Sequence, residues 1–191
     1  MRTGRVLVLA GVAGLSLVAG DAAAGGREKK SAAYTVAGAS VTLPDRGYDR
    51  RDAESKEVAF GPRADQACHL DSCGWYGDDV QYTLTVVTLP LGLRGAPKGV
   101  MLAGAKKGLL EPAGQGTVLE VEDTKLVSLP AGLSDCMALN IRAGSRRIRA
   151  RVVVYDGRVY QLTAVGPNAA VDSDAVTAAL DTFRVTGPPG V

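Results

Sequence analysis

The sequence predicts an α+β fold, with a single antiparallel β-sheet of about six to seven strands flanked by two or three helices. From Tyr34 onward, short apolar runs alternate with Gly, Pro, Asn and Asp, which is typical of strands and turns. Residues 97–110 and 173–183 are the segments with a helical pattern. The predicted connections are short, and consecutive strands joined by short connections pair antiparallel.

The length and composition set limits on function. The chain has 191 residues, a formal net charge of +2 and one histidine, and its aromatic content is 5%. This length suggests one domain. The single histidine excludes a multi-histidine metal centre, and the low aromatic content argues against a stacking platform for nucleic acid. We therefore expect no cofactor, no metal and no nucleic-acid partner. We also expect a monomer.

The N-terminus resembles a secretory signal peptide. Arg2 and Arg5 precede the uncharged run Val6–Ala19, and three alanines follow at 22–24. A basic start, an apolar core and an A-x-A-like site are the three parts of such a peptide. The core is shorter than the roughly 20 residues that span a bilayer. We expect cleavage near Ala24, with Gly20 as the second choice, and a secreted or periplasmic protein without a transmembrane span.

The predicted organisation has four parts: a signal peptide at 1–24, a flexible leader at 25–33, a single α+β domain at 34–186 and a flexible tail at 187–191. The alternative for the N-terminus is a retained anchor.

The first half of the domain is predicted to hold five strands. They are Tyr34–Ala37, Val41–Leu43, Glu57–Phe60, Asp65–Leu70 and Val80–Leu89. The last is the strongest because it is rich in Tyr, Thr and Val. Residues 45–57 are dense in charge, so we expect a solvated loop there. Pro97 suits the first position of the helix at 97–110, and Pro112 is expected to end it.

The second half is predicted to contain more strands and a closing helix. The strands are Thr117–Val121, Lys125–Leu129, Leu133–Arg142, Arg147–Tyr155 and Arg158–Val165. Asp156-Gly157 joins the last two, and this pair tolerates the positive φ of a two-residue hairpin turn. Asp172 or Ser173 caps the helix at 173–183.

A family resemblance appears between Ile148 and Val185. An arginine-studded strand leads into the run Val154–Leu162, then Val165-Gly166-Pro167, and a helix followed by Phe183-Arg184-Val185. This looks like the C-terminal half of small exported bacterial proteins with a PsbP-like fold, named for the extrinsic PsbP subunit of photosystem II and shared by Mog-type Ran-binding proteins. The resemblance implies a PsbP-like α/β/α sandwich. Because members bind very different partners, it implies no function.

Cys68 and Cys73 flank four residues, a suitable length for a hairpin loop, and cysteines of an exported protein tend to oxidise. We expect a Cys68–Cys73 disulfide. The alternatives are a bridge from Cys136 to one of them, no bridge, or a metal site that adds His69 and Asp71. Cys136 itself is expected to be a buried thiol. A reactive Cys136 would need His69 as its base, because the chain has no other histidine.

Arg147, Arg149 and Arg151 alternate with apolar residues, so period-two geometry puts these arginines on one face of a strand. Arg142 and Arg158 are expected nearby. One interpretation is a solvated face whose arginine stems cover apolar surface or whose arginines pair with acidic neighbours on adjacent strands. The other is a docking patch for an anionic partner, since guanidinium groups bind carboxylate or phosphate bidentately.

No credible catalytic set emerges, and the chain lacks a G-x-S-x-G motif. The sequence therefore favours an exported, non-enzymatic binding or assembly module whose partner is an unknown protein or anionic polymer outside the cytoplasm. The alternative is an extracytoplasmic hydrolase or thiol-dependent enzyme that uses His69 or Cys136.

Overall fold

The computed structural model describes residues 33–44, 49–59, 67–114, 119–127 and 136–187. The expected signal peptide, most of the leader and the end of the tail lie outside the described residues. The expectations placed on them stay predictions.

The centre of the protein is a seven-stranded sheet in the order β3-β4-β5-β9-β8-β7-β6, and a second sheet has the order β1-β2-β10. The strand pairs among the described residues are all antiparallel. The strands of the large sheet are β3 (Asp49–Ala59), β4 (Ala67–Tyr76), β5 (Gln81–Thr88), β6 (Leu119–Val127), β7 (Cys136–Ala143), β8 (Arg146–Tyr155) and β9 (Arg158–Pro167). Those of the small sheet are β1 (Ala33–Val36), β2 (Ala39–Thr42) and β10 (Arg184–Val185).

The prediction of a single sheet flanked by helices is wrong, although the α+β class is correct. The β1–β2 hairpin does not extend the large sheet. It lies against one face of that sheet, and β10 pairs with β2 instead. The reason is burial: Ala39 and Val41 are each 1% exposed and belong to the same core as the large sheet. A hairpin laid flat over a sheet buries its apolar face more completely than an edge strand does.

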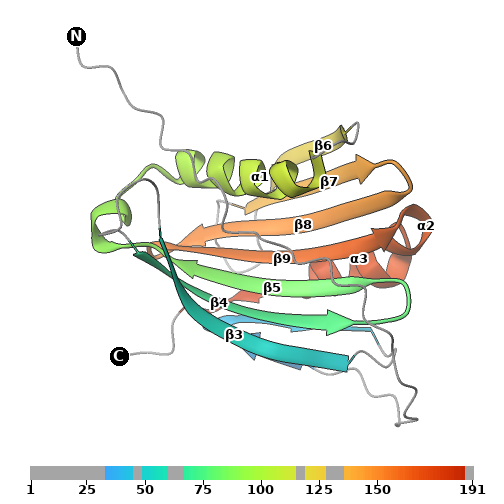
Figure 1. Cartoon of the computed structure of the whole chain (residues 1–191), viewed down its shortest axis with the longest axis horizontal. Coiled ribbons are helices and arrows are strands. Elements are labelled where there is room, and N and C mark those ends of the chain that lie inside the picture. The colour runs from blue at the N-terminus through green and yellow to red at the C-terminus, as the bar shows by residue number, and fades with distance from the viewer. Residues whose placement is uncertain (1–32, 45–48, 60–66, 115–118, 128–135, 188–191) are drawn as a thin grey trace.

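The helices are η1 (Leu91–Leu93), α1 (Lys98–Gly114), α2 (Asn168–Val171) and α3 (Asp174–Asp181). Helix α1 lies over one face of the large sheet, across β6 to β9, while α3 and the small sheet lie over the opposite face (Figure 1). The result is two hydrophobic cores, one on each face of the large sheet.

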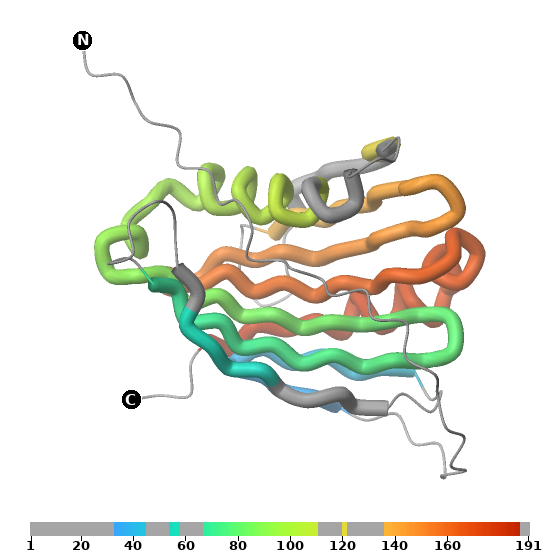
Figure 2. The backbone as a smooth tube through the Cα atoms, viewed as in Figure 1, coloured from blue at the N-terminus to red at the C-terminus, as the bar shows by residue number. Residues whose placement is uncertain are grey.

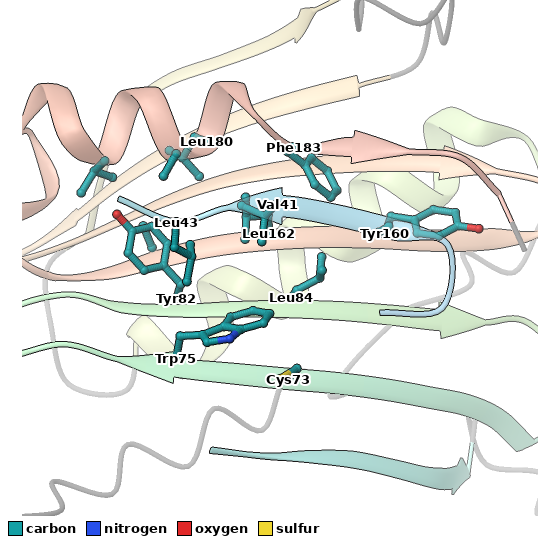
Figure 3. Packing of buried hydrophobic residues seen from close by; sticks show 14 of the residues in the cluster. Val41, Leu43, Cys73, Trp75, Tyr82, Leu84, Tyr160, Leu162, Leu180 and Phe183 are labelled. Atoms are coloured by element: carbon teal, nitrogen blue, oxygen red, sulfur yellow. The ribbon is translucent and has the colours of Figure 1, made fainter. Parts of the chain in front are cut away.

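The larger core joins the large sheet to the small one. Trp75, Tyr82 and Leu162 point from the large sheet toward Val41 on β2 and toward Phe183, which follows α3 (Figure 3). On the other face, α1 contributes Met101, Leu102 and Leu109 to the second core. Both faces of β8 and β9 are therefore buried over much of their length.

Two local predictions are wrong in the first half of the domain. The charged segment 45–57 was expected to be a loop, but β3 covers most of it. An edge strand accommodates such charge, because one of its sides pairs with no other described strand. The expected loop between Cys68 and Cys73 is also absent, because β4 runs through both residues without interruption.

Two predicted segment boundaries are also wrong. Helix α1 continues past Pro112 to Gly114. The two strands expected at 117–121 and 125–129 form one strand, β6, with a register shift between Val121 and Asp123.

The strongest local signals are confirmed. The β8–β9 hairpin turns at Asp156 and Gly157, whose φ angles are 47° and 66°. Ser173 caps α3, and its side chain accepts a hydrogen bond from the Val176 N–H.

Candidate functional site

The arginines of β8 lie on the face of the large sheet that carries α2 and α3. Arg147 is 5% exposed. Its Nε donates to Asn140 Oδ1 at 2.6 Å, and its Nη1 donates to Asp172 Oδ2 at 2.5 Å. Asp172 directly follows α2. The first arginine of the series therefore ties the end of α2 to the sheet.

The next two arginines continue the contact toward α3. Arg149 Nη1 donates to Thr177 Oγ1 at 2.9 Å and to the Val171 carbonyl at 3.3 Å. Arg151 Nη2 donates to Asp181 Oδ1 at 3.1 Å. Burial first, and then the nearby Arg151, lower the pKa of Arg149 from its ordinary value. We call Arg147, Arg149 and Arg151 the arginine ladder.

The predicted alternation of the arginine ladder is confirmed, but its partners differ from those expected. They come from the C-terminal helices rather than from adjacent strands. Sequence reasoning missed Asp172, Thr177 and Asp181 because they lie 25 to 30 residues along the chain from the arginines they meet. Asp and Thr residues before and along a helix do not by themselves indicate that their side chains contact a strand.

Arg142 and Arg158 are placed differently. Arg142 stands opposite Arg147 in the β7–β8 register, and its Nη1 lies 3.6 Å from Glu120 Oε2. Arg158 pairs with Tyr155 at the far end of the hairpin. Eight residues of strand separate Tyr155 from Arg147, which is roughly 26 Å. The five arginines do not form one cluster, and binding of an anion to them stays a prediction.

The predicted Cys68–Cys73 disulfide is wrong. Both cysteines are buried in β4 and are not bonded to each other. Five residues apart in a strand, they point to opposite faces and lie roughly 16 Å from each other, whereas the Cα atoms of a disulfide are within about 7 Å. Cys68 belongs to the α1-side core and Cys73 to the core under the small sheet. Burial first, and then the charge of Glu57, raise the pKa of Cys68 to about 11.

Cys136 is a buried thiol, as predicted. It is 0% exposed, and burial raises its pKa. It lies on β7, while His69 lies on β4, with β5, β9 and β8 between these strands in the sheet. The structure therefore does not bring Cys136 and His69 together.

His69 stands on the surface between β3 and β4. Its Nε2 lies 3.0 Å from Ser55 Oγ and 3.3 Å from Asp71 Oδ1, and its Nδ1 lies 3.1 Å from Glu57 Oε1. The imidazole is 42% exposed. Glu57 faces His69 in the β3–β4 register, Ser55 faces Asp71, and Asp71 lies two residues along β4 from His69. Sequence reasoning missed Ser55 because it had assigned residues 45–57 to a loop, and it placed Glu57 only where that loop meets a predicted strand.

A pocket of about 300 Å³ lies elsewhere, where the start of α1 meets the β8–β9 turn. Its lining includes Arg94, Lys98, Met101, Asp156 and Gly157, and it does not include His69.

Within the described part of the chain, no group of His, Cys, Asp and Glu is arranged to hold a metal ion. Among the same residues, no helix has the length and apolar character needed to cross a bilayer.

Comparison with known proteins identifies the fold. No family model and no curated protein matches the chain. The solution structure of the cyanobacterial PsbP protein CyanoP from Synechocystis sp. PCC 6803 matches with a TM-score of 0.54 and 16% identity, over 87% of this chain and 98% of that one. A protein of unknown function from Pseudomonas aeruginosa, PA94, matches with a TM-score of 0.43 and 16% identity, over 83% and 99% of the two chains. The likeness to the cyanobacterial protein shows that this chain has a PsbP-like fold.

Proposed function

We propose that the chain is a non-enzymatic binding or assembly module that acts outside the cytoplasm. The observation that carries this proposal is a neutral, polar sheet surface on the same side of the large sheet as α1. It lies over β4, β5 and β9, beside the helix, and no described element covers it in Figure 1. We call it the open face.

The side chains of the open face follow from the register. Thr85 pairs with Ser72 on β4 and with Gln161 on β9, and Thr83 lies two residues along β5 on the same face. Thr83, Thr85 and Gln161 are half-buried. Hydroxyl and amide groups offer hydrogen bonds without the desolvation cost of a full charge, so such a surface suits a protein partner.

The positions of the reactive groups support a binding role rather than catalysis. The thiols of Cys68 and Cys136 are buried with raised pKa values, and the arginine ladder is engaged with α2 and α3. The sequence layout at residues 1–24 supports export.

Export is tested by fractionating host cells that produce the tagged full chain. We expect an extracytoplasmic protein whose N-terminal residue is Gly25, and a cytoplasmic product when residues 2–24 are deleted. A full-length chain that stays in the cytoplasm would contradict this part of the proposal.

Binding is tested by cross-linking in intact cells, with and without charge on the open face. Thr83→Lys with Thr85→Lys places two cations on it, and Ser145→Lys with Ala178→Lys is the matched control at exposed positions elsewhere. We expect the cross-linked species to disappear with the first pair alone, while circular dichroism shows both proteins folded. Identical cross-linking by the two variants would show that the open face is not the docking surface.

The five arginines stay candidate contacts for an anionic partner. Arg142 and Arg158 are the informative pair, because the arginine ladder also supports the fold. We expect Arg142→Ser with Arg158→Ser to weaken retention on an anionic resin at low salt more than Lys56→Ser with Lys106→Ser does. Equal retention would remove these two residues as contacts.

A second function, hydrolysis, is favoured by the spatial arrangement in which His69 lies between Ser55 and Glu57. An imidazole with a hydroxyl at Nε2 and a carboxylate at Nδ1 is the arrangement that activates a serine for attack on an ester. If it is active, p-nitrophenyl acetate hydrolysis falls to the uncatalysed rate in Ser55→Ala, and Ser145→Ala leaves it unchanged. A rate that Ser55→Ala does not alter excludes this function.

A further inference from the structure

The pocket at the start of α1 is formed by two segments that are distant in the chain. One is the connection from β5 into α1, and the other is the β8–β9 turn (Figure 2). A backbone hydrogen bond from Leu89 N–H to the Gly157 carbonyl, at 3.1 Å, holds the two segments together. The pocket volume, about 300 Å³, is at the small end of the range for ligand sites.

Arg94 is held in place before any ligand arrives. Its Nε donates to the Leu89 carbonyl at 3.0 Å. Its stem lies on Gly157, where an added Cβ would be 2.6 Å from Arg94 Cγ. These two contacts fix the side chain. Among the described residues its terminal nitrogens have no hydrogen-bond partner, so the fork of the guanidinium is available to a carboxylate.

Asp156 supplies the opposite charge in the same pocket. It stands in the left-handed region with φ 47°, so the turn fixes its backbone. Within the described residues, the carboxylate of Asp156 forms no ion pair, with Arg94 or with any other side chain. Two cations, Arg94 and Lys98, and one anion, Asp156, therefore line one small pocket, and Arg94 and Asp156 do not neutralise each other.

Apart from Lys98, the remaining wall is apolar. Met101 from α1 and Val154 from β8 line the pocket and are 3% and 2% exposed. A ligand matching this lining has a negative group, a positive group and a short aliphatic part.

We propose that this pocket binds a free α-amino acid with an aliphatic side chain. The α-carboxylate pairs with Arg94, the α-ammonium with Asp156, and the side chain lies against Met101 and Val154. A simple anion would leave the carboxylate of Asp156 without a counter-charge. A peptide carries its two terminal charges on different residues, so it does not offer both at the spacing of one carbon atom. The inference does not depend on the proposed function, because the pocket and the open face are separate surfaces.

The test is titration of the ¹⁵N-labelled full chain with L-leucine, followed by NMR. We expect saturable shifts of backbone amides in 94–101 and 154–157. N-acetyl-leucine lacks the ammonium and leucine methyl ester lacks the carboxylate, so each is expected to bind at least tenfold more weakly. Leucyl-leucine distinguishes a peptide from the free amino acid, and sodium acetate tests for a plain anion site.

Two variants test which pocket residue binds each charged group of leucine. Arg94→Gln and Asp156→Asn each remove one charge, and asparagine tolerates the positive φ of the turn. Both are expected to weaken leucine binding at least tenfold, whereas the surface control Lys56→Gln binds as the parent does. Amide spectra of the unliganded variants show whether the hairpin is intact.

Several outcomes would overturn the proposal. They are the absence of saturable shifts with 20 mM leucine, equal affinity for N-acetyl-leucine, acetate or leucyl-leucine, and unchanged affinity in a folded Asp156→Asn protein. None of these results bears on cross-linking through the open face, so this inference and the proposed function can fail separately.

Discussion

Arg147 on β8 and Asp172 at the end of α2 form an ion pair at 2.5 Å, although 25 residues of chain separate them. The arginine side chain is 6% exposed and the carboxylate is 43% exposed. The nearly buried Arg147 therefore pairs with a carboxylate at the surface. Replacing that carboxylate tests whether the arginine ladder holds α2 on the sheet.

Replacing Asp172 with asparagine is expected to destabilise the fold by about 2 kcal/mol, because it removes the carboxylate that pairs with the nearly buried Arg147. Urea denaturation measures the loss. Lys56→Gln breaks an exposed pair with Glu54 and serves as the control, with an expected change below about 0.5 kcal/mol. Equal stability of the two variants would mean that the ladder does not hold α2.

The thiol of Cys68 is expected to make stability fall at high pH. Its pKa is raised from 9.0 to about 11 in the folded protein, so folding favours the protonated thiol. Its contribution is therefore complete below pH 9 and is lost as pH rises from about 9 to 11. Urea midpoints across that range should decline less in Cys68→Val than in the parent; parallel curves would contradict the assignment.

Gly157→Ala is expected to destabilise the protein by about 1 to 2 kcal/mol, for two reasons. The residue has φ 66°, and its new Cβ would meet the stem of Arg94. Gly99→Ala in α1 is the control, since nothing lies within 4 Å of its added Cβ. Thermal melts compare them, and a Gly157→Ala protein as stable as Gly99→Ala would contradict the close contact.

Ser173→Ala is expected to cost about 1 kcal/mol by removing the cap of α3. The serine hydroxyl also donates to the Ala170 carbonyl at 2.8 Å, so its loss affects the junction of α2 and α3. Ser145→Ala, in an exposed turn, is the control for chemical denaturation. If both variants unfold at the same urea concentration, the cap contributes nothing measurable.

The features predicted correctly from sequence are those that neighbouring residues determine. Asp156-Gly157 specifies its own turn, and Ser173 is three residues from the N–H it caps. The second sheet was not predictable in this way. β10 has two residues, too few for a periodic pattern, and it pairs with β2 near the start of the domain.

In the candidate sites, too, the features set by neighbouring residues were predictable and those set by distant residues were not. Period-two spacing placed the arginine ladder on one face, but no local signal indicated Asp172 or Thr177 as partners. The error at Cys68 and Cys73 had a local cause, because His69-Leu70-Asp71-Ser72 suits a turn when read alone. The pairing of β4 with a strand on each side keeps that segment extended. The pocket of Arg94 and Asp156 depends on a contact between segments about 60 residues apart, which spacing along the chain does not reveal.

The pairing of β2 with β10 has a consequence for how the polypeptide reaches its final form. Ser40 pairs with Arg184, so the small sheet closes only after the chain beyond Val185 has left the ribosome. Contacts of such long sequence separation form slowly, because a large loop must close first. Until residues 184 and 185 have been synthesised, the first hairpin has no third strand beside it, and its open edge can pair with another strand.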